Sequence, residues 1–520
     1  MNLKKHPQLL FLLIIFLLTL LIYNGTRHFV MLPYGIHQWR QSMNYSIIQN
    51  FQEPHTHFFK PAMDNLLNPD NTGYLILEFP IFQWLISFLP REYFPYFRWL
   101  IYLSSLSGLY FAFQWSYQIL KNFYLALASI LIIFFTPLFL FYNANYFVDL
   151  PAILWSISAV YFWKKATDEN FSPKSMGIGT IFYTLAGLLR PVGLAMPFAF
   201  MIDYGVRNFK KNKILFFYFI LSTSLIVIWY IYQQKNNPTY EVHTPPQTSI
   251  FYSSKEEIKN VLYAFRDFHF HQFGFIFGSI FPYIISFLII GFHWKYYEKT
   301  LKNIFIWTSI GTWAYIILWF KVFQDHDYYL IPCLSFFFIT SLMTLMALHH
   351  YLSTKSLYIT ISVILLFCFY HGYENYRLRD FRGWYGFNWN ATKFEEGMFW
   401  WIHQEDQMIW SKIRDLSTHL DTLQKAGIQK KDTVICNFDT TPAYVLSLLQ
   451  LKGWSLPNEK GTMNRFEQYQ YYINRGAKYL IHYGNRTAVE NDPQKDSLLK
   501  QKLVLQYDSI KFYKIDHLKN

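Results

Sequence analysis

The chain has 520 residues, of which 52% are hydrophobic, 21% aromatic and only 15% charged. This composition is typical of a polytopic membrane protein and excludes an ordinary soluble globular protein. The formal net charge of +13 does not indicate a nucleic-acid partner, because the lysines and arginines collect in short loops and form no basic patch with interleaved aromatic residues.

The first apolar segment, residues 9–23, follows Lys4 and Lys5. A signal peptide would start in a similar way, but no small-residue cleavage motif follows, so we expect a retained span with its N-terminus in the cytoplasm. The next stretch, residues 24–96, is polar and is expected outside the membrane. Its prolines and tryptophans predict short helices at the interface rather than a linker.

Further apolar segments bring the expected total to about eleven transmembrane helices. These predicted spans are 97–120, 123–142, 148–163, 176–189, 191–204, 214–232, 275–292, 304–320, 328–348 and 357–370. The two spans that flank Arg190 are short for a hydrocarbon core of about 30 Å, so they form a re-entrant hairpin or a packed pair. We therefore predict a polytopic α-helical membrane domain over residues 1–370, in contact with the lipid bilayer.

The basic loops share one side of the membrane. By alternation they lie with Lys4 and Lys5, as the positive-inside rule requires, and they are 164–165, 207–213, 293–302 and 349–355. The opposite, outer side then holds the outer loop, the approach to Asp149, Arg190 and residues 324–329. It also holds the tail, residues 371–520.

The tail has more charge and mixed periodicity. Residues 433–436, 479–482 and 503–507 are predicted strands, and 442–451 and 465–475 predicted helices, so we expect a small extracytoplasmic α/β domain. Asp439 lies just before a predicted helix that begins at a proline. This position favours helix capping over a carboxylate site.

The outer loop contains the run His37-Gln38-Trp39-Arg40-Gln41. Arginine beside tryptophan offers a guanidinium fork for phosphate and an aromatic face for a sugar or a lipid chain. An interfacial aromatic anchor with a snorkelling arginine explains the same pattern.

Two acids follow in this loop, Asp64 and Glu78. Glu78 precedes a proline and an apolar stretch, where the loop meets the membrane. It is a candidate general base or a partner for Arg40.

Asp149 and Arg190 are the charged residues at outer ends of apolar segments. Asp149 starts a predicted helix, where the helix dipole favours a carboxylate whether or not that carboxylate takes part in catalysis. Arg190 has only apolar neighbours and no carboxylate nearby in sequence, so it must find an anion in space or reach water. A phosphate ligand would satisfy it.

A last polar group, His326-Asp327-Tyr328-Tyr329, stands at the mouth of a late span, where tyrosines are also ordinary interface residues. His269 and His271 alternate in an outer loop without a third ligand nearby, so we expect no metal there. Cys333, Cys368 and Cys436 indicate neither a disulfide framework nor a cysteine metal site. No cofactor is expected.

The order of these features resembles glycosyltransferase family 39. The resemblance rests on the Asn-x-Tyr-x-x-Asp string that ends at Asp149, the Leu-Leu-Arg-Pro-Val-Gly-Leu segment around Arg190 and the His-Asp-Tyr-Tyr-Leu-Ile-Pro entry that begins at His326. These enzymes have the GT-C fold and are related to protein O-mannosyltransferases and lipid A aminoarabinose transferases. The resemblance covers roughly residues 1–370.

The resemblance implies transfer of a sugar, with inversion, from a polyprenyl-phosphate donor to a lipid, glycan or protein acceptor of the cell envelope, on the outer face of the membrane. Abundant Lys, Asn and Phe with few Gly residues fit an AT-rich genome, so we expect a bacterial inner membrane. The family has two acidic positions, and Asp149 then matches the second of them. Arg190 matches the basic residue that holds the lipid phosphate, and His326 to Tyr329 match the late-loop motif. The first acidic position, in the first outer loop, has no match in this chain. The base is therefore Asp149, Glu78, Asp64 or His37, with Trp39, Arg40 and Gln41 as substrate-binding residues.

A transporter or flippase of a lipid-linked or anionic solute is the alternative function. It would place its charges near the bilayer midplane and repeat its halves. No such repeat is visible in the sequence. A polysaccharide polymerase or ligase that uses the same donor is a further alternative.

Overall fold

The computed structural model describes residues 6–25, 27–66, 70–168, 172–205, 213–237, 245–266, 281–324, 326–379, 409–439, 441, 443–455, 465–484 and 501–516. Contacts divide the chain into two compact units. The helical unit contains Met1–Val30 and Tyr96–Phe399, and the mixed unit contains Met31–Pro95 and Trp400–Asn520.

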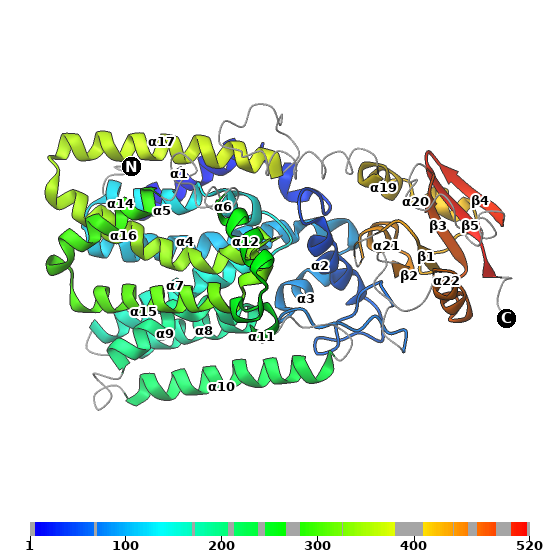
Figure 1. Ribbon diagram of the computed structural model, residues 1–520, viewed down its shortest axis with the longest axis horizontal. Helices are drawn as coiled ribbons and strands as arrows, with labels where there is room; N and C mark the ends of the chain where they lie inside the picture. Colours follow the sequence, from blue (N-terminus) through cyan, green and yellow to red (C-terminus); the bar gives the residue numbers. More distant parts are fainter. Residues whose placement is uncertain are drawn as a thin grey trace. The chain divides into compact units, whose positions relative to one another are not determined.

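The helical unit is built from long apolar helices joined by short turns (Figure 1). Its elements are α1 (Pro7–Ile22), η2 (Arg27–Val30), α4 (Phe97–Leu120), α5 (Phe123–Phe134), α6 (Pro137–Tyr142), α7 (Asp149–Asp168), α8 (Pro173–Leu189), η4 (Pro191–Leu194), α9 (Ala195–Phe200), η5 (Met201–Gly205), α10 (Lys213–Asn236), α11 (Pro245–Thr248), η6 (Ile250–Tyr252), α12 (Lys255–Ala264), α14 (Phe281–His293), η8 (Trp294–Tyr296), α15 (Lys299–Leu318), η9 (Phe320–Gln324), η10 (Asp327–Cys333), α16 (Leu334–Tyr351) and α17 (Thr354–Arg379).

One predicted span is interrupted. The sequence predicted a single helix over residues 123–142, but α5 ends at Phe134 and α6 begins at Pro137. Proline has no N–H to donate and disfavours a helical conformation in the residue before it, so Thr136 is extended, with ψ 141°. The Thr136 hydroxyl then accepts the N–H of Phe139 at 3.2 Å and caps α6.

The short segments around Arg190 are a packed set of helices. α8 lies along α7, and α9 packs against α15. Arg190 itself is extended, with φ −152° and ψ 98°, and separates α8 from η4. The predicted span 191–204 is therefore a 3-10 turn, a short α-helix and a π turn in succession.

α7 is buried along nearly its whole length and packs against α4 and α8, which run beside it in Figure 1. Glycines allow these helices to approach closely. A Cβ at Gly108 of α4 would overlap Leu154 of α7, and one at Gly179 of α8 would lie 2.6 Å from the Trp163 ring of α7. Small residues at helix crossings are typical of membrane proteins.

Four helical segments within the described residues are long and apolar enough to cross a membrane: Lys213–Asn236, Lys299–Leu318, Asp327–Tyr351 and Thr354–Arg377. Shorter apolar helices are Pro7–Ile22, Phe123–Phe134 and Pro191–Tyr204. α10 exposes large apolar side chains, including Phe217 at 63% and Ile228 at 62%. A lipid environment satisfies such surfaces, and the chain is a membrane protein. The expected count of eleven spans stays a prediction.

The mixed unit combines short helices with one sheet. Its elements are α2 (Gln38–Asn50), α3 (Ile81–Ser87), η3 (Arg91–Tyr96, whose last residue belongs to the helical unit), α19 (Ser411–Ser417), α20 (Leu420–Lys425), β1 (Thr433–Cys436), α21 (Tyr444–Leu449), β2 (Lys452–Ser455), α22 (Arg465–Asn474), β3 (Tyr479–Tyr483), β4 (Lys502–Tyr507) and β5 (Ile510–Lys514).

The sheet has the strand order β2-β1-β3-β5-β4. β1 pairs in parallel with β2 and β3, whereas β5 pairs antiparallel with β3 and β4. The sequence predicted β1, β3 and β4 within one residue of their bounds. It did not predict β2 and β5.

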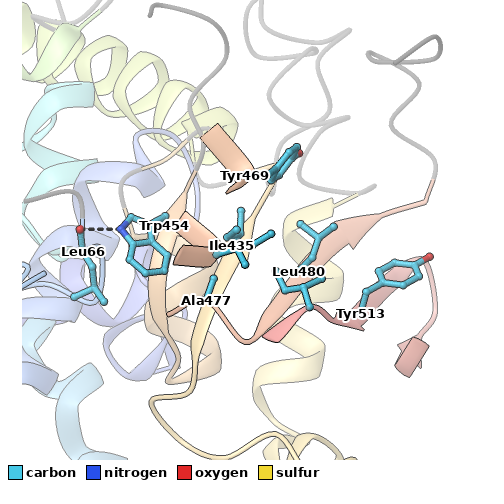
Figure 2. Close-up of a cluster of buried hydrophobic side chains, with 9 residues drawn as sticks. Leu66, Ile435, Trp454, Tyr469, Ala477, Leu480 and Tyr513 are labelled. Carbon is cyan, nitrogen blue, oxygen red and sulfur yellow. Dashed lines mark hydrogen bonds between the residues drawn. The ribbon is translucent and has the colours of Figure 1, made fainter. Parts of the chain in front are cut away.

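The outer loop forms backbone hydrogen bonds with β2, the edge strand of this sheet. Leu66 donates its N–H to Gly453 O at 2.7 Å, and Gly453 donates to Asp64 O at 3.0 Å. Trp454 Nε1 donates to Leu66 O at 2.9 Å, and Leu66 lies in the same apolar core as Ile435 (Figure 2). The predicted membrane domain, residues 1–370, includes 24–96, whereas Met31–Pro95 lies in the mixed unit. The predicted boundary after residue 370 falls inside α17, which continues to Arg379.

Candidate functional site

Asp149 and Arg190 form an ion pair in the helical unit. Arg190 Nε lies 2.7 Å from Asp149 Oδ1, and Nη2 donates to Oδ2 at 3.4 Å. The Asp149 side chain is 8% exposed and that of Arg190 23% exposed. The anion that pairs with Arg190 is therefore a carboxylate, and the Arg190 side chain stays partly exposed.

The packing of α7 against α8 explains why Asp149 and Arg190 lie close together. Asp149 is the first residue of α7, where the helix N-terminus favours a carboxylate. Arg190 follows the last residue of α8, and α8 packs along α7. Because the two helices are antiparallel neighbours, the start of one lies beside the end of the other.

The turn η10, which follows His326, packs against α7 and η4. The His326 ring stacks on Tyr328, with the ring centroids 5.4 Å apart, and Tyr315 of α15 donates its hydroxyl to Tyr329 O at 2.8 Å. The structure thus brings Asp149, Arg190 and the His326 to Tyr329 group to the same end of the helical unit, as the sequence predicted.

Asp327 makes buried contacts within this group. Its Oδ2 accepts Arg379 Nε of α17 at 3.2 Å, and its Oδ1 accepts the hydroxyl of Tyr142 of α6. The Asp327 and Arg379 side chains are fully buried. Asp327 was a predicted substrate-binding residue, but its carboxylate is occupied by protein groups, and it joins η10 to α6 and α17.

A second buried cationic cluster was not predicted. Arg98 of α4 is fully buried, donates to Ala144 O at 3.0 Å and lies 5.0 Å from the centre of the Tyr146 ring. His28 Nε2 is 3.2 Å from the Arg98 guanidinium. Arg98 is the sole charged residue in the sequence of α4. A lone charge in an apolar helix could have predicted this buried cluster from the sequence. The cluster orders the turn that leads to Asp149.

In the mixed unit, Arg40 donates to the Glu78 carboxylate, and both side chains are buried. Gln83 Nε2 donates to Glu78 Oε1 at 3.0 Å and to Asn44 Oδ1 at 2.9 Å. The pairing confirms the interpretation of Glu78 as a partner of Arg40. The Glu78 side chain is only 1% exposed, so a role as base requires the site to open.

The neighbours of Arg40 shape the start of α2. Gln41 is fully buried, and its Nε2 donates to Tyr34 O at 2.7 Å and Ile36 O at 3.0 Å. His37 has a left-handed conformation, with φ 52°, at the N-cap of α2. His37 and Trp39 are half-buried, so both can contact a ligand at the surface. Gln41 instead holds the turn in place.

Asp64 is buried and bonded to α2. Ser46 Oγ donates to Oδ2 at 2.7 Å, and Asn50 Nδ2 donates to Oδ1 at 2.9 Å. Burial raises the pKa of the Asp64 carboxyl, and the hydrogen bonds from Ser46 and Asn50 oppose this shift. The role of Asp64 as a base stays a prediction.

Asp439 bonds to the first turn of α21, as a helix-start role predicts, although the N-cap residue is Ala443. Its carboxylate accepts the N–H groups of Thr441 at 2.8 Å and Val445 at 2.9 Å. Burial raises the pKa of Asp439 to about 6. These contacts are structural and leave no function to assign.

Within the described part of the chain, no group of three or more His, Cys, Asp or Glu side chains could hold a metal ion. His269 and His271 lie outside the described residues. Cys333, Cys368 and Cys436 are free and buried.

No protein-family model matches the sequence, and no curated protein matches it. Two crystal structures of ArnT from Cupriavidus metallidurans are similar to the whole chain. The apo structure has a TM-score of 0.57 and 9% identity, covering 98% of this chain and 98% of that chain. The structure bound to undecaprenyl phosphate has a TM-score of 0.58 and 10% identity, covering 96% of this chain and 97% of that chain.

The Archaeoglobus fulgidus oligosaccharyltransferase in the apo form is also similar, with a TM-score of 0.51 and 12% identity, covering 93% of this chain and 70% of that chain. ArnT and the oligosaccharyltransferase are GT-C proteins. The present chain therefore has the GT-C fold, as the resemblance implied.

Proposed function

We propose that this protein is a membrane glycosyltransferase that moves a sugar from a polyprenyl-phosphate donor to a cell-envelope acceptor. The observation that carries the proposal is the partly exposed Arg190 side chain, paired with Asp149 at one end of a GT-C helical unit. ArnT, which has this fold, binds undecaprenyl phosphate. An arginine fork is suited to the phosphate of such a lipid.

In the proposed reaction, the acceptor hydroxyl attacks the anomeric carbon of the donor sugar. The bond between that carbon and the phosphate oxygen breaks, and the polyprenyl phosphate leaves with the electron pair. The hydroxyl proton passes to a base. One displacement from the opposite side inverts the anomeric configuration.

Arg190 would stabilise the charge that develops on the departing phosphate. A guanidinium carries five N–H donors in a rigid fork, more than one carboxylate uses. Asp149 orients this fork and is the base that we favour, because it lies at the same end of the helical unit as Arg190. Glu78, Asp64 and His37 are the alternative bases.

We place the reaction on the outer face of a bacterial inner membrane, with the N-terminus in the cytoplasm. The positive-inside pattern of the loops supports this orientation. His326, Tyr328 and Tyr329 would line the approach to Arg190, and Trp39 would offer an aromatic face to the sugar or the lipid.

The test is release of undecaprenyl phosphate from radiolabelled undecaprenyl-phosphate sugars by the purified protein. Asp149→Asn, Glu78→Gln and Arg190→Ala are compared with the unmodified chain. Asp168→Asn is a matched control, because Asp168 is an exposed carboxylate at the other end of α7. We expect turnover to fall about 100-fold or more in Asp149→Asn, since general base catalysis contributes about that much.

Each variant is first shown to be folded by gel filtration and thermal unfolding. Loss of turnover in folded Glu78→Gln with full turnover in Asp149→Asn would move the base to Glu78. No turnover with any donor, together with donor movement across proteoliposomes, would contradict the transferase proposal and favour a transporter.

A further inference from the structure

A basic pocket lies within the mixed unit, apart from the ion pair of Asp149 and Arg190. It is shallow and opens to solvent, and the space of about 220 Å³ at its mouth includes open solvent. Four cationic side chains line it: Arg91, Lys430, Lys431 and Lys452. Two carboxylates, Glu53 and Asp64, also line it, so the cations outnumber the acids.

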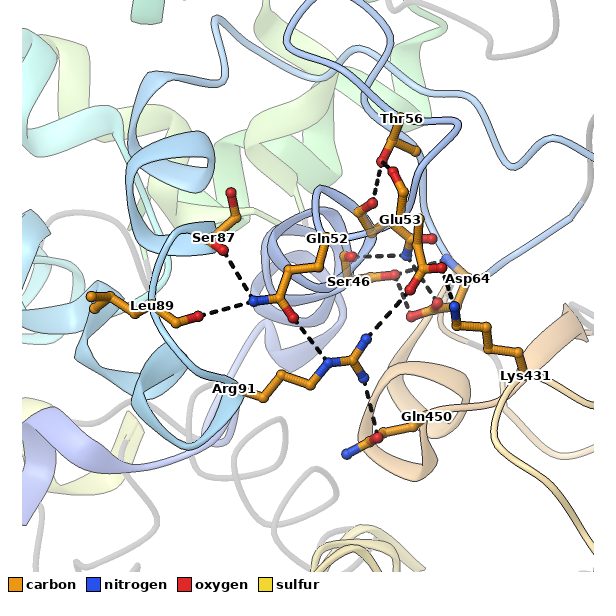
Figure 3. Close-up of polar contacts among 11 residues, drawn as sticks. Ser46, Gln52, Glu53, Thr56, Asp64, Ser87, Leu89, Arg91, Lys431 and Gln450 are labelled. Atoms are coloured by element: carbon orange, nitrogen blue, oxygen red, sulfur yellow. Dashed lines mark hydrogen bonds and ion pairs between the residues drawn. The ribbon is translucent and has the colours of Figure 1, made fainter.

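Glu53 is neutralised by protein groups (Figure 3). Lys431 donates to its carboxylate, and Arg91 Nη2 lies 3.4 Å from its Oε1. Arg91 also donates to Gln450 Oε1 at 3.2 Å. The carboxylate of Glu53 thus holds two of the four cations in a fixed frame at the pocket wall.

Asp64 forms no ion pair with Lys430 or Lys452, although its charge acts on both. Its oxygens accept hydrogen bonds from Ser46 and Asn50, and burial raises the pKa of its carboxyl. Among the described residues, neither the Lys430 nor the Lys452 ammonium group has a hydrogen bond or an ion pair. Two of the four cations are therefore near the Glu53 and Asp64 carboxylates without an ion pair to either.

The cations also act on one another. Burial is the main cause that lowers the pKa of Lys430 and Lys452. Neighbouring positive charges lower each further, Arg91 and Lys431 at Lys430 and Lys431 at Lys452, while the Asp64 and Glu53 carboxylates oppose these shifts. A bound anion would relieve this repulsion. Closely placed cations with few counterions are expected where a protein binds a multiply charged anion.

The backbone at the pocket is held in an uncommon conformation. Lys431 and Gln450 have positive φ angles of 67° and 57°, and Lys431 donates its N–H to Gln450 O at 3.0 Å. Glycine adopts this conformation at lower cost, yet both positions carry side chains that line the pocket. This hydrogen bond links the turn that carries Lys430 to the segment just before β2, which begins at Lys452.

We propose that this pocket binds a phosphate group, held by Lys430 and Lys452 with support from Arg91 and Lys431. Because the pocket is open, the phosphate can be free or can be carried on a saccharide. The inference does not rest on the transferase proposal, since the pocket belongs wholly to the mixed unit and binding requires no transfer.

The test is calorimetric titration of the full-length protein, in a detergent without phosphate, with inorganic phosphate, glucose 6-phosphate and glucose. We expect the unmodified protein to bind the two phosphates, and Lys430→Ala/Lys452→Ala to weaken binding about tenfold or more, because charge-assisted hydrogen bonds are lost. The control Lys425→Ala/Lys514→Ala removes the same charge from side chains that are 79% and 44% exposed. It should bind as the unmodified protein does.

Tighter binding of glucose 6-phosphate would support a phosphate carried on a saccharide, and equal binding would support a free phosphate. Glucose binding as strong as glucose 6-phosphate binding, equal weakening by the control, or no phosphate binding would overturn the proposal. If the double variant does not fold, Lys430→Ala alone serves, because Lys430 is exposed.

Discussion

Arg379 Nε lies 3.2 Å from the Asp327 carboxylate, and both side chains are fully buried. The same carboxylate accepts the hydroxyl of Tyr142. One buried charge pair therefore joins α6, η10 and α17, which are far apart in the sequence. Asp327 is the sequence neighbour of His326 and Tyr328. Loss of the charge pair would therefore disturb the turn that carries these two residues of the proposed site.

Removing one partner of this pair should strongly destabilise the protein. Arg379→Met leaves Asp327 buried without its cation, which costs about 3–5 kcal/mol. Arg377→Met is the control, because Arg377 pairs with Glu374 at a partly exposed position, where an ion pair contributes about 0–1 kcal/mol. Thermal unfolding in detergent measures both. Equal melting temperatures for the two variants would contradict a buried pair.

Glu78→Gln should lower stability and reveal whether Glu78 has a further role. The change leaves Arg40 buried beside a neutral amide, at a cost of about 3 kcal/mol. Glu92→Gln, at an exposed position of the same loop, should have little effect. Turnover per folded molecule is then compared for the two variants. If Glu78 serves only to hold Arg40, the folded fraction of Glu78→Gln keeps its turnover. Loss of turnover in that folded fraction would mean that Glu78 has a further role.

Gly372→Ala should disturb the packing of α17. A Cβ at this position would overlap the carbonyl of Phe135, and a backbone atom cannot move aside as a side chain can. We expect a loss of about 1–3 kcal/mol. Gly291→Ala is the matched control in α14, since nothing lies within 4 Å of its added Cβ and alanine favours the helix. A stabilised Gly372→Ala variant would show that α17 does not pack there.

The stability of the protein should depend on the ionisation of Asp439. Its pKa is raised from 3.8 to about 6 by burial. Between these values the folded protein binds a proton that the unfolded chain releases, so this contribution to stability is full below about pH 4 and is lost as the pH rises through about 6. Asn at this position does not titrate.

We therefore expect the stability of the unmodified protein, relative to Asp439→Asn, to fall by on the order of 2 kcal/mol between pH 4 and pH 7. Thermal unfolding of both proteins across this range measures the difference. Parallel curves for the two proteins would mean that Asp439 titrates normally.

Local patterns predicted much of the fold. The helix over 97–120 and the strand over 433–436 lie where the sequence placed them, because apolar length and alternation are properties of neighbouring residues. The break at Pro137 was also readable in principle, since proline acts on the residue beside it. We missed β2, whose four residues include Gly453 packed against the Val434 backbone.

The choice of partners was decided only by the tertiary structure. The sequence alone identified Asp149, Arg190 and Asp327 as charged residues at the ends of apolar segments. Leaving any of these charges unpaired beside a membrane span costs free energy. Which charge meets which follows from the packing of α7 on α8 and of α17 on α6. Asp149 and Arg190 are separated by 41 residues, and no periodicity within either segment encodes that contact. The sequence determines that these charges need partners. The antiparallel packing of the helices determines which partner each charge has.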